Sequence, residues 1–123
     1  MPVPYEPIPV LYQSVLQALD PRPGGRYIDA TVGLGGHAAG ILEASSPDGR
    51  LLGLDVDPAG LALAGEHLAS FGKRASLARA DYTTLAAVAR ERGFVPVQGV
   101  LFDLGVSSLQ LDQPERGFSI QYD

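Results

Sequence analysis

Short apolar runs recur along the chain and predict the strands of a buried sheet. Glycine, proline or charged residues bound each run, and aliphatic residues fill its centre, as expected for a strand covered on both faces. We predict four strands, at Arg26–Ala30, Leu51–Asp55, Ala75–Ala80 and Gln98–Asp103.

Between these runs, apolar residues recur at the three- and four-residue spacing of an amphipathic helix. The first such segment, residues 9–19, precedes the first predicted strand. Asp57 and Pro58 suit the N-cap and the first position of a helix that Gly72 would end. The predicted helices therefore cover residues 9–19, about 37–44, 58–71 and about 83–92.

The order of these elements predicts the fold class. A helix is followed by strands that alternate with helices, which favours a parallel sheet covered on both faces. Right-handed crossovers then produce a doubly wound α/β fold. The last segment, Leu104–Asp123, has no clear periodicity. We therefore expect the sheet to be truncated after its fourth strand.

Composition narrows the possible functions. Hydrophobic residues make up 46% of the 123 residues, which is enough for the core of one domain. The absence of cysteine excludes disulfides, cysteine-ligated zinc and thiol catalysis. The net charge is −5 and lysines and arginines form no run, so we expect no compact basic patch for nucleic acid. Neither a membrane-spanning apolar run nor a signal peptide is present, which favours the cytosol.

A glycine-rich turn follows the first predicted strand. Residues 33–38 match the pattern G-x-G-x-x-G/A, in which glycines allow a ligand to approach the backbone closely. The start of the next helix supplies N–H groups, and Asp55 ends the second strand, where a carboxylate can accept from both ribose hydroxyls. The pattern predicts an adenosine-containing cofactor. The alternative is a turn that only tightens a strand–helix corner.

Both nicotinamide dinucleotides and S-adenosylmethionine (SAM) fit this layout, and three features favour SAM. Asp29 ends the first strand, where an acid would approach a dinucleotide's pyrophosphate but suits the cationic groups of SAM. A helix precedes the first strand, whereas dinucleotide-binding domains usually begin with the strand. Asp103 ends the fourth strand, where a methyl donor and an acceptor amine would meet. An NAD-dependent oxidoreductase remains the alternative enzyme.

Several segments together resemble one family. They are Ile8–Leu11, Tyr27–Thr31, Gly33–His37, Leu54–Pro58 and, above all, DLGVSSLQLDQPERGFS at 103–119. These residues resemble the ribosomal RNA small subunit methyltransferase H family, also called MraW, over nearly the whole chain. The resemblance implies a Rossmann-like, SAM-dependent enzyme of the bacterial cytoplasm that methylates N4 of a cytosine in 16S ribosomal RNA (rRNA). Because family members are longer, residues 1–123 are expected to be the N-terminal, SAM-binding half of a class I methyltransferase domain.

The resemblance also implies a set of cofactor-binding residues, each of which has a structural alternative. The set is Gly35, Gly36, His37, Asp55, Tyr82, Asp103 and Gln110. Without the resemblance, His37 could be a surface histidine, Tyr82 a half-buried core residue and Gln110 an ordinary loop residue. Asp81 either bonds to the adenine amino group or caps the helix that follows, and Asp57 is expected only to cap. No metal site is expected, because the Asp, Glu and His residues are scattered.

Asp103 is the candidate catalytic residue. The lone pair of cytosine N4 is delocalised into the ring, which makes this amine a poor nucleophile. A hydrogen-bond acceptor beside the amine would favour the rehybridised nitrogen and its developing positive charge. Ser107 and Ser108 have no histidine at a suggestive spacing, so nucleophilic catalysis is not expected.

The expected partners follow from charge and from the predicted sheet. An acidic chain is expected to contact 16S rRNA of the small ribosomal subunit through the part of the protein that lies outside it. The alternative is a fragment that binds SAM or a nucleoside without activity. The predicted fourth strand pairs with the first strand on one side and leaves its other edge unpaired at Val100–Phe102. Such an edge would invite pairing with a second copy, so we expect a symmetric homodimer.

Overall fold

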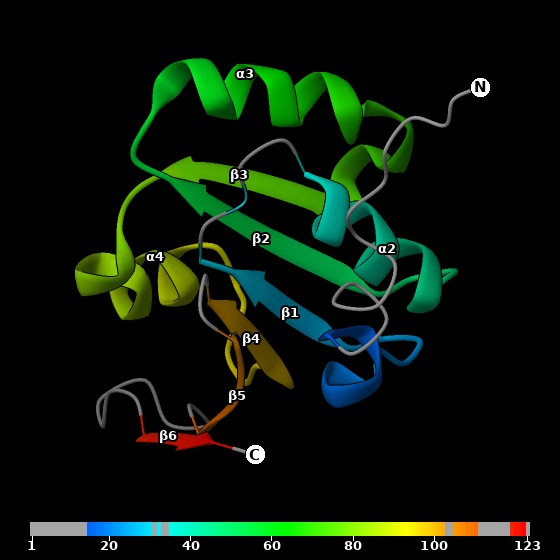
Figure 1. Cartoon of the computed structure of the whole chain (residues 1–123), viewed down its shortest axis with the longest axis vertical. Coiled ribbons are helices and arrows are strands. Elements are labelled where there is room, and N and C mark those ends of the chain that lie inside the picture. The colour runs from blue at the N-terminus through cyan, green and yellow to red at the C-terminus, as the bar shows by residue number, and fades with distance from the viewer. Residues whose placement is uncertain (1–14, 31, 33–34, 103–104, 111–118, 123) are drawn as a thin grey trace.

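A computed structural model describes residues 15–30, 32, 35–102, 105–110 and 119–122 (Figure 1). Residues 15–19 are helical, and the part of the predicted first helix over 9–14 lies outside the described residues. The strands are β1 (Arg26–Asp29), β2 (Arg50–Asp55), β3 (Ala75–Arg79), β4 (Gly99–Phe102), β5 (Gly105–Gln110) and β6 (Ser119–Tyr122). The α-helices are α2 (Gly36–Ala44), α3 (Pro58–His67) and α4 (Leu85–Glu91), and short 3₁₀ helices are η1 (Ala69–Arg74) and η2 (Tyr82–Thr84).

The sheet has the order β3-β2-β1-β4-β5-β6. β1 pairs in parallel with β2 and β4, and β2 pairs in parallel with β3. The prediction of four parallel strands in a doubly wound α/β fold is confirmed, and the observed strand bounds differ from the predicted ones by a residue or two. None of the helices among the described residues is long and apolar enough to cross a membrane.

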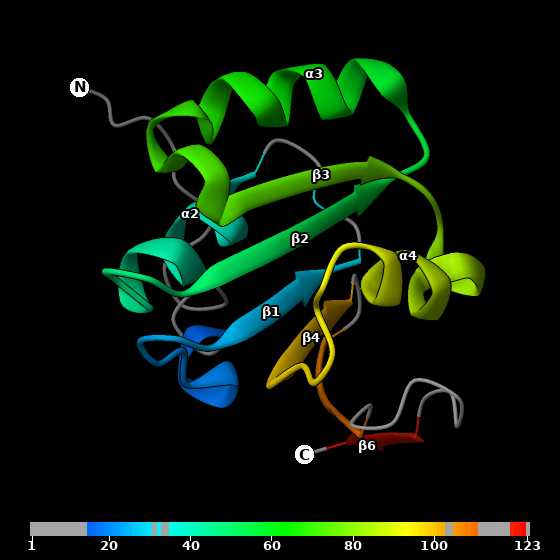
Figure 2. The ribbon, with the colours of Figure 1, turned by 180° about the vertical axis from the view of Figure 1, so that it is seen from behind.

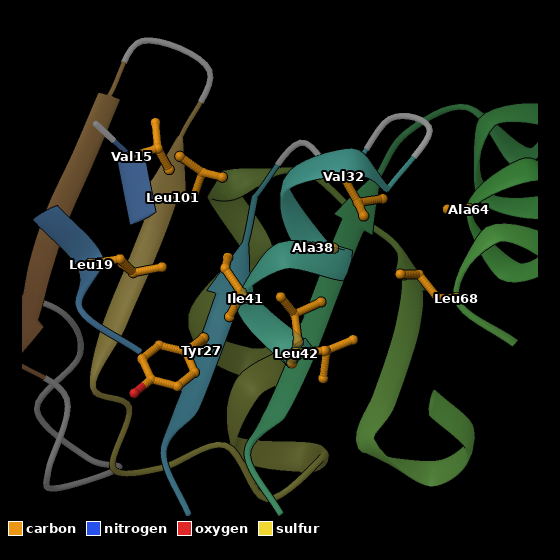
Figure 3. Close-up of a cluster of buried hydrophobic side chains, with 11 residues drawn as sticks. Val15, Leu19, Tyr27, Val32, Ala38, Ile41, Leu42, Ala64, Leu68 and Leu101 are labelled. Carbon is orange, nitrogen blue, oxygen red and sulfur yellow. The ribbon is translucent and has the colours of Figure 1, made fainter. Parts of the chain in front are cut away.

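Two buried clusters cover the two faces of the sheet, because neighbouring residues of each strand point to opposite sides. Tyr27 and Leu51 belong to the cluster under α2, α3 and residues 15–19 (Figure 3). Ile28 and Leu52, the next residues along each strand, belong to the cluster under α4. Figures 1 and 2 show helices on both faces of the parallel strands. Burial on both faces explains why these strands are apolar without alternation.

Two predicted helix boundaries are wrong, for local reasons. α3 ends at His67 rather than near residue 71, since the chain tightens into η1, where serine and glycine have low helix propensity. Gly72 still supplies a turn, with φ 61°. α4 begins at Leu85 rather than near residue 83, because η2 precedes it.

The expectation that the sheet is truncated after its fourth strand is also wrong. β5 pairs antiparallel with β4, and β6 pairs antiparallel with β5. Val106 and Leu109 stand three residues apart, which breaks the two-residue alternation that signals a strand. Backbone pairing with β4 forms the strand regardless of that pattern. Because β4 is paired on both sides, the predicted homodimer has no open edge of β4 to use.

Candidate functional site at the carboxyl edge of the sheet

Parallel pairing brings the carboxyl ends of β1, β2 and β3 together at one end of the sheet, which we call the carboxyl edge. Asp29 ends β1, Asp55 ends β2 and Arg79 ends β3. In the register, Asp29 lies beside Gly53 and Leu101, and Asp55 lies beside Arg79. Ligands of doubly wound folds bind at this edge, where the connections diverge to opposite faces. The two predicted acids therefore belong to one edge of the sheet.

The described part of the glycine-rich turn is fastened to the neighbouring strands. The Ala30 N–H donates to the Leu101 carbonyl at 2.8 Å, and the Val32 N–H donates to the Leu54 carbonyl at 2.8 Å. Gly35 then takes φ 90° as the N-cap of α2, a conformation that favours glycine. These contacts direct the start of α2 toward the carboxyl edge.

Gly36 opens α2 with room around it. A Cβ built on this exposed glycine meets no atom within 4 Å, so packing within the described chain does not require glycine here. The first N–H groups of α2 donate no hydrogen bond to a capping side chain, because the N-cap residue is Gly35. Glycine backbone and helix-start N–H groups are suited to the carboxylate of an amino-acid ligand. The half-buried His37 follows in the same helical turn.

Backbone hydrogen bonds orient the carboxylate of Asp55. Its Oδ1 accepts from the Asp57 N–H at 3.0 Å, and its backbone carbonyl accepts from the Ala80 N–H at 3.0 Å. Arg79 Nε donates to the Val56 carbonyl at 3.1 Å and so ties β3 to the turn after β2. The half-buried carboxylate is thereby held at the end of β2, where a ribose-binding acid is expected.

Of the two roles predicted for Asp81, capping is the one that the contacts show. Its Oδ1 accepts from the Thr83 N–H at 2.9 Å, and its carbonyl accepts from the Thr84 N–H at 3.2 Å. The hydrogen bond from the Thr83 hydroxyl, followed by that from the Thr83 N–H, lowers the pKa of the exposed Asp81 carboxyl. Asp57 caps α3 as predicted, because its Oδ1 accepts from the Ala59 N–H at 3.0 Å.

The remaining predicted site residues, Tyr82, Asp103 and Gln110, are described only in part. Tyr82 begins η2 after β3, and only its backbone is described. Asp103 lies outside the described residues. β5 starts at Gly105 opposite Phe102 and runs back past Ser107 opposite Val100, so the backbone of Gln110 lies away from the carboxyl edge. Gln110 is therefore not brought together with Asp55, and its role stays a prediction.

Sequence reasoning missed two neighbours of the site. Arg79 could have been found as a cation that ends a strand beside the strand of Asp55. His67 is exposed, yet its Cδ2 would lie 3.5 Å from a Cβ on Gly35, so the end of α3 contacts the turn. No local sequence pattern predicts the contact between His67 and the turn. Among the described residues, no cluster of three or more His, Cys, Asp or Glu could hold a metal ion.

Nearly the whole chain is similar in sequence to a known family and to curated proteins. A sequence model of the MraW methylase family matches residues 5–123. The ribosomal RNA small subunit methyltransferase H of Symbiobacterium thermophilum is 56% identical over 116 residues, which cover 94% of this chain and 36% of that protein. The chain spans about a third of the length of the curated relatives it matches.

Solved structures are similar in fold. TrmN from Thermus thermophilus superposes with a TM-score of 0.60 and 31% identity, covering 76% of this chain and 27% of that one. An rRNA methylase from Streptococcus thermophilus has a TM-score of 0.60 and 20% identity, covering 82% of this chain and 52% of that one. The similarity to the second structure shows the fold alone.

Proposed function

The chain belongs to the MraW methylase family, and from this premise we propose that residues 1–123 form the N-terminal, SAM-binding half of a class I methyltransferase domain. We propose that the whole protein methylates the exocyclic N4 of a cytosine in 16S rRNA of the small ribosomal subunit, in the cytoplasm. SAM supplies the methyl group on a sulfonium, which makes that group electrophilic. The family assignment agrees with the resemblance drawn from the sequence.

The observation that carries the proposal is the position of the glycine-rich turn beside Asp55. The turn follows β1, Asp55 ends the adjacent β2, and hydrogen bonds tie residues 30 and 32 to β4 and β2. We assign Gly35, Gly36 and His37 to the methionine end of SAM and Asp55 to its ribose. The open space at Gly36 and the oriented Asp55 carboxylate support this assignment.

The family resemblance supports the other assignments. Tyr82 follows β3, next to the strand of Asp55, which suits a ring stacked on adenine. Asp103 follows β4 directly in the sequence and is proposed to accept a hydrogen bond from the target amine. Such an acceptor orients the nitrogen and stabilises the positive charge that develops on it. Gln110 is retained as a proposed cofactor contact on the resemblance alone.

Calorimetric titration of the chain with SAM tests this proposal. We expect binding that Asp55→Asn abolishes or weakens strongly, because the amide lacks the charge that orders the ribose hydroxyls. Asp48→Asn is the matched control, since Asp48 is exposed in the loop before β2. Equal binding by wild type and Asp55→Asn would remove Asp55 from the site, and preferential binding of NAD⁺ would favour an oxidoreductase.

A further inference from the structure

Three arginines lie at the amino-terminal ends of neighbouring strands, at the opposite end of the sheet from the proposed cofactor site. Arg26 begins β1 and is in register with Arg50, which begins β2. Leu51 is in register with Ala75, so Arg74, the residue before β3, lies beside Arg50. Neighbouring strands are about 4.8 Å apart. Parallel pairing therefore gathers Arg26, Arg50 and Arg74 into one row, which we call the arginine row.

Carbonyl groups and aromatic rings hold the side chains of this row. Arg26 Nη1 donates to the Pro96 carbonyl at 3.4 Å, and the Arg50 guanidinium lies 4.7 Å from the centre of the Phe94 ring. Arg74 Nε donates to the Gly49 carbonyl at 2.7 Å, and its Nη2 donates to the Leu42 carbonyl. A guanidinium has more N–H donors than these contacts use. Arg26 and Arg50 therefore reach the segment 94–96 on the α4 face, whereas Arg74 reaches α2 on the other face. The guanidinium groups of Arg26 and Arg50 are thus positioned on one side of the sheet while donors remain for a further acceptor.

Carboxylates do not neutralise the row within the described part of the chain. The ion pair found there joins Arg22 to Asp20, at 2.7 Å. Asp48 lies at the same end of the sheet, in the loop before β2, but is not in an ion pair with the row among the described residues. In this described part, unpaired arginine side chains therefore stand together in an acidic chain whose sequence contains no basic run.

We propose that Arg26 and Arg50 of the arginine row bind the phosphodiester backbone of RNA, the polymer that carries the proposed substrate. This inference rests on the proposed function. Guanidinium groups bind phosphate with paired hydrogen bonds, and side chains that are already positioned lose little entropy on binding. β2 has six residues, so about 20 Å separates the two edges, which a folded RNA spans easily. The large exposed apolar residues of the described part, Val56 and Leu63, lie outside the row, which disfavours a membrane partner.

Fluorescence anisotropy with a short labelled RNA hairpin, measured over a series of KCl concentrations, tests the row. Each phosphate contact that is lost should reduce the slope of log affinity against log salt by about 1. We expect a reduction of about 1 for Arg50→Gln and about 2 for the Arg26→Gln/Arg50→Gln pair. Arg22→Gln is the matched control, because it removes the same charge from an arginine already paired with Asp20. It should leave the slope unchanged.

The double variant Arg26→Lys/Arg50→Lys shows whether a changed slope comes from lost charge or from a disturbed fold, because it replaces both side chains but retains both positive charges. Its slope should stay near that of wild type. Absence of RNA binding at low salt, or an equal change of slope in Arg22→Gln, would overturn the proposal. Binding to phosphatidylglycerol vesicles without binding to RNA would also overturn it.

Calorimetry with SAM on the same variants keeps the two proposals distinguishable. Normal SAM binding together with no RNA binding would refute the row and leave the proposed cofactor site intact. RNA binding through the row without SAM binding would refute the cofactor site alone.

Discussion

Gly53 lies in the middle of β2, where alanine should destabilise the fold. A Cβ at this position would lie 2.8 Å from Leu77 Cδ2, 2.9 Å from Val32 Cγ2 and 3.1 Å from Val32 Cβ. Carbon atoms in contact prefer about 3.5–4.0 Å, so the neighbours must move by roughly 0.5–1 Å. Leu77 can rotate its terminal methyl group. Val32 cannot, because its Cβ is attached directly to a backbone whose N–H bonds to the Leu54 carbonyl.

The expected magnitude combines two opposing effects. Overpacking of a well-packed core costs about 1–3 kcal/mol, and replacing glycine with alanine recovers about 0.4–1 kcal/mol by restricting the unfolded chain. Gly53→Ala should therefore lower the free energy of unfolding by about 1–2 kcal/mol. Urea unfolding followed by circular dichroism should show a lower midpoint at an unchanged slope m.

Gly65→Ala is the matched control, because its Cβ would contact the same leucine at an ordinary distance. That Cβ would lie 3.7 Å from Leu77 Cδ1, and Gly65 stands inside α3. Alanine is about 0.5–1 kcal/mol better than glycine within a helix, so this variant should be more stable than wild type. Adding Val32→Ala to Gly53→Ala should relieve part of the strain. If Gly53→Ala is as stable as wild type, the argument from the Val32 contact is refuted.

Three further predictions concern the helix caps and the activity of the chain. Asp57→Ala should lower the free energy of unfolding by about 1 kcal/mol, and Asp57→Asn by much less, since asparagine also caps; equal losses in urea unfolding would contradict this. Hydrogen bonds lower the folded-state pKa of Asp81, so its stabilising effect is present above the unfolded pKa of about 3.9 and disappears as the pH falls through the folded value. The stability difference between wild type and Asp81→Asn should accordingly be constant near neutral pH and shrink in acid, which unfolding curves at several pH values can check. The purified chain alone should not transfer labelled methyl groups to small ribosomal subunits, because it spans about a third of the length of its relatives. Transfer at a useful rate would contradict this.

Local patterns in the sequence determined the parallel strands, the glycine-rich turn and the cap of α3. A strand covered on both faces must be apolar along its buried part, and this requirement is visible in Leu51–Leu54 without knowledge of its neighbours. The cap at Asp57 forms within two residues, through Ala59. The family, too, was identified from contiguous motifs, above all the segment at 103–119.

Pairing between segments distant in the sequence decided the extra strands, the arginine row and the requirement for glycine at position 53. β5 exists because the edge of β4 offers hydrogen bonds, so the spacing of Val106 and Leu109 could not reveal it. The arginine row joins residues 26, 50 and 74, which no run of sequence connects, although each begins or directly precedes a strand. Glycine at position 53 is required by Val32 and Leu77 together. In each case the energy depends on atoms that only the folded sheet brings within a few ångströms, whereas periodicity reports burial along a single segment.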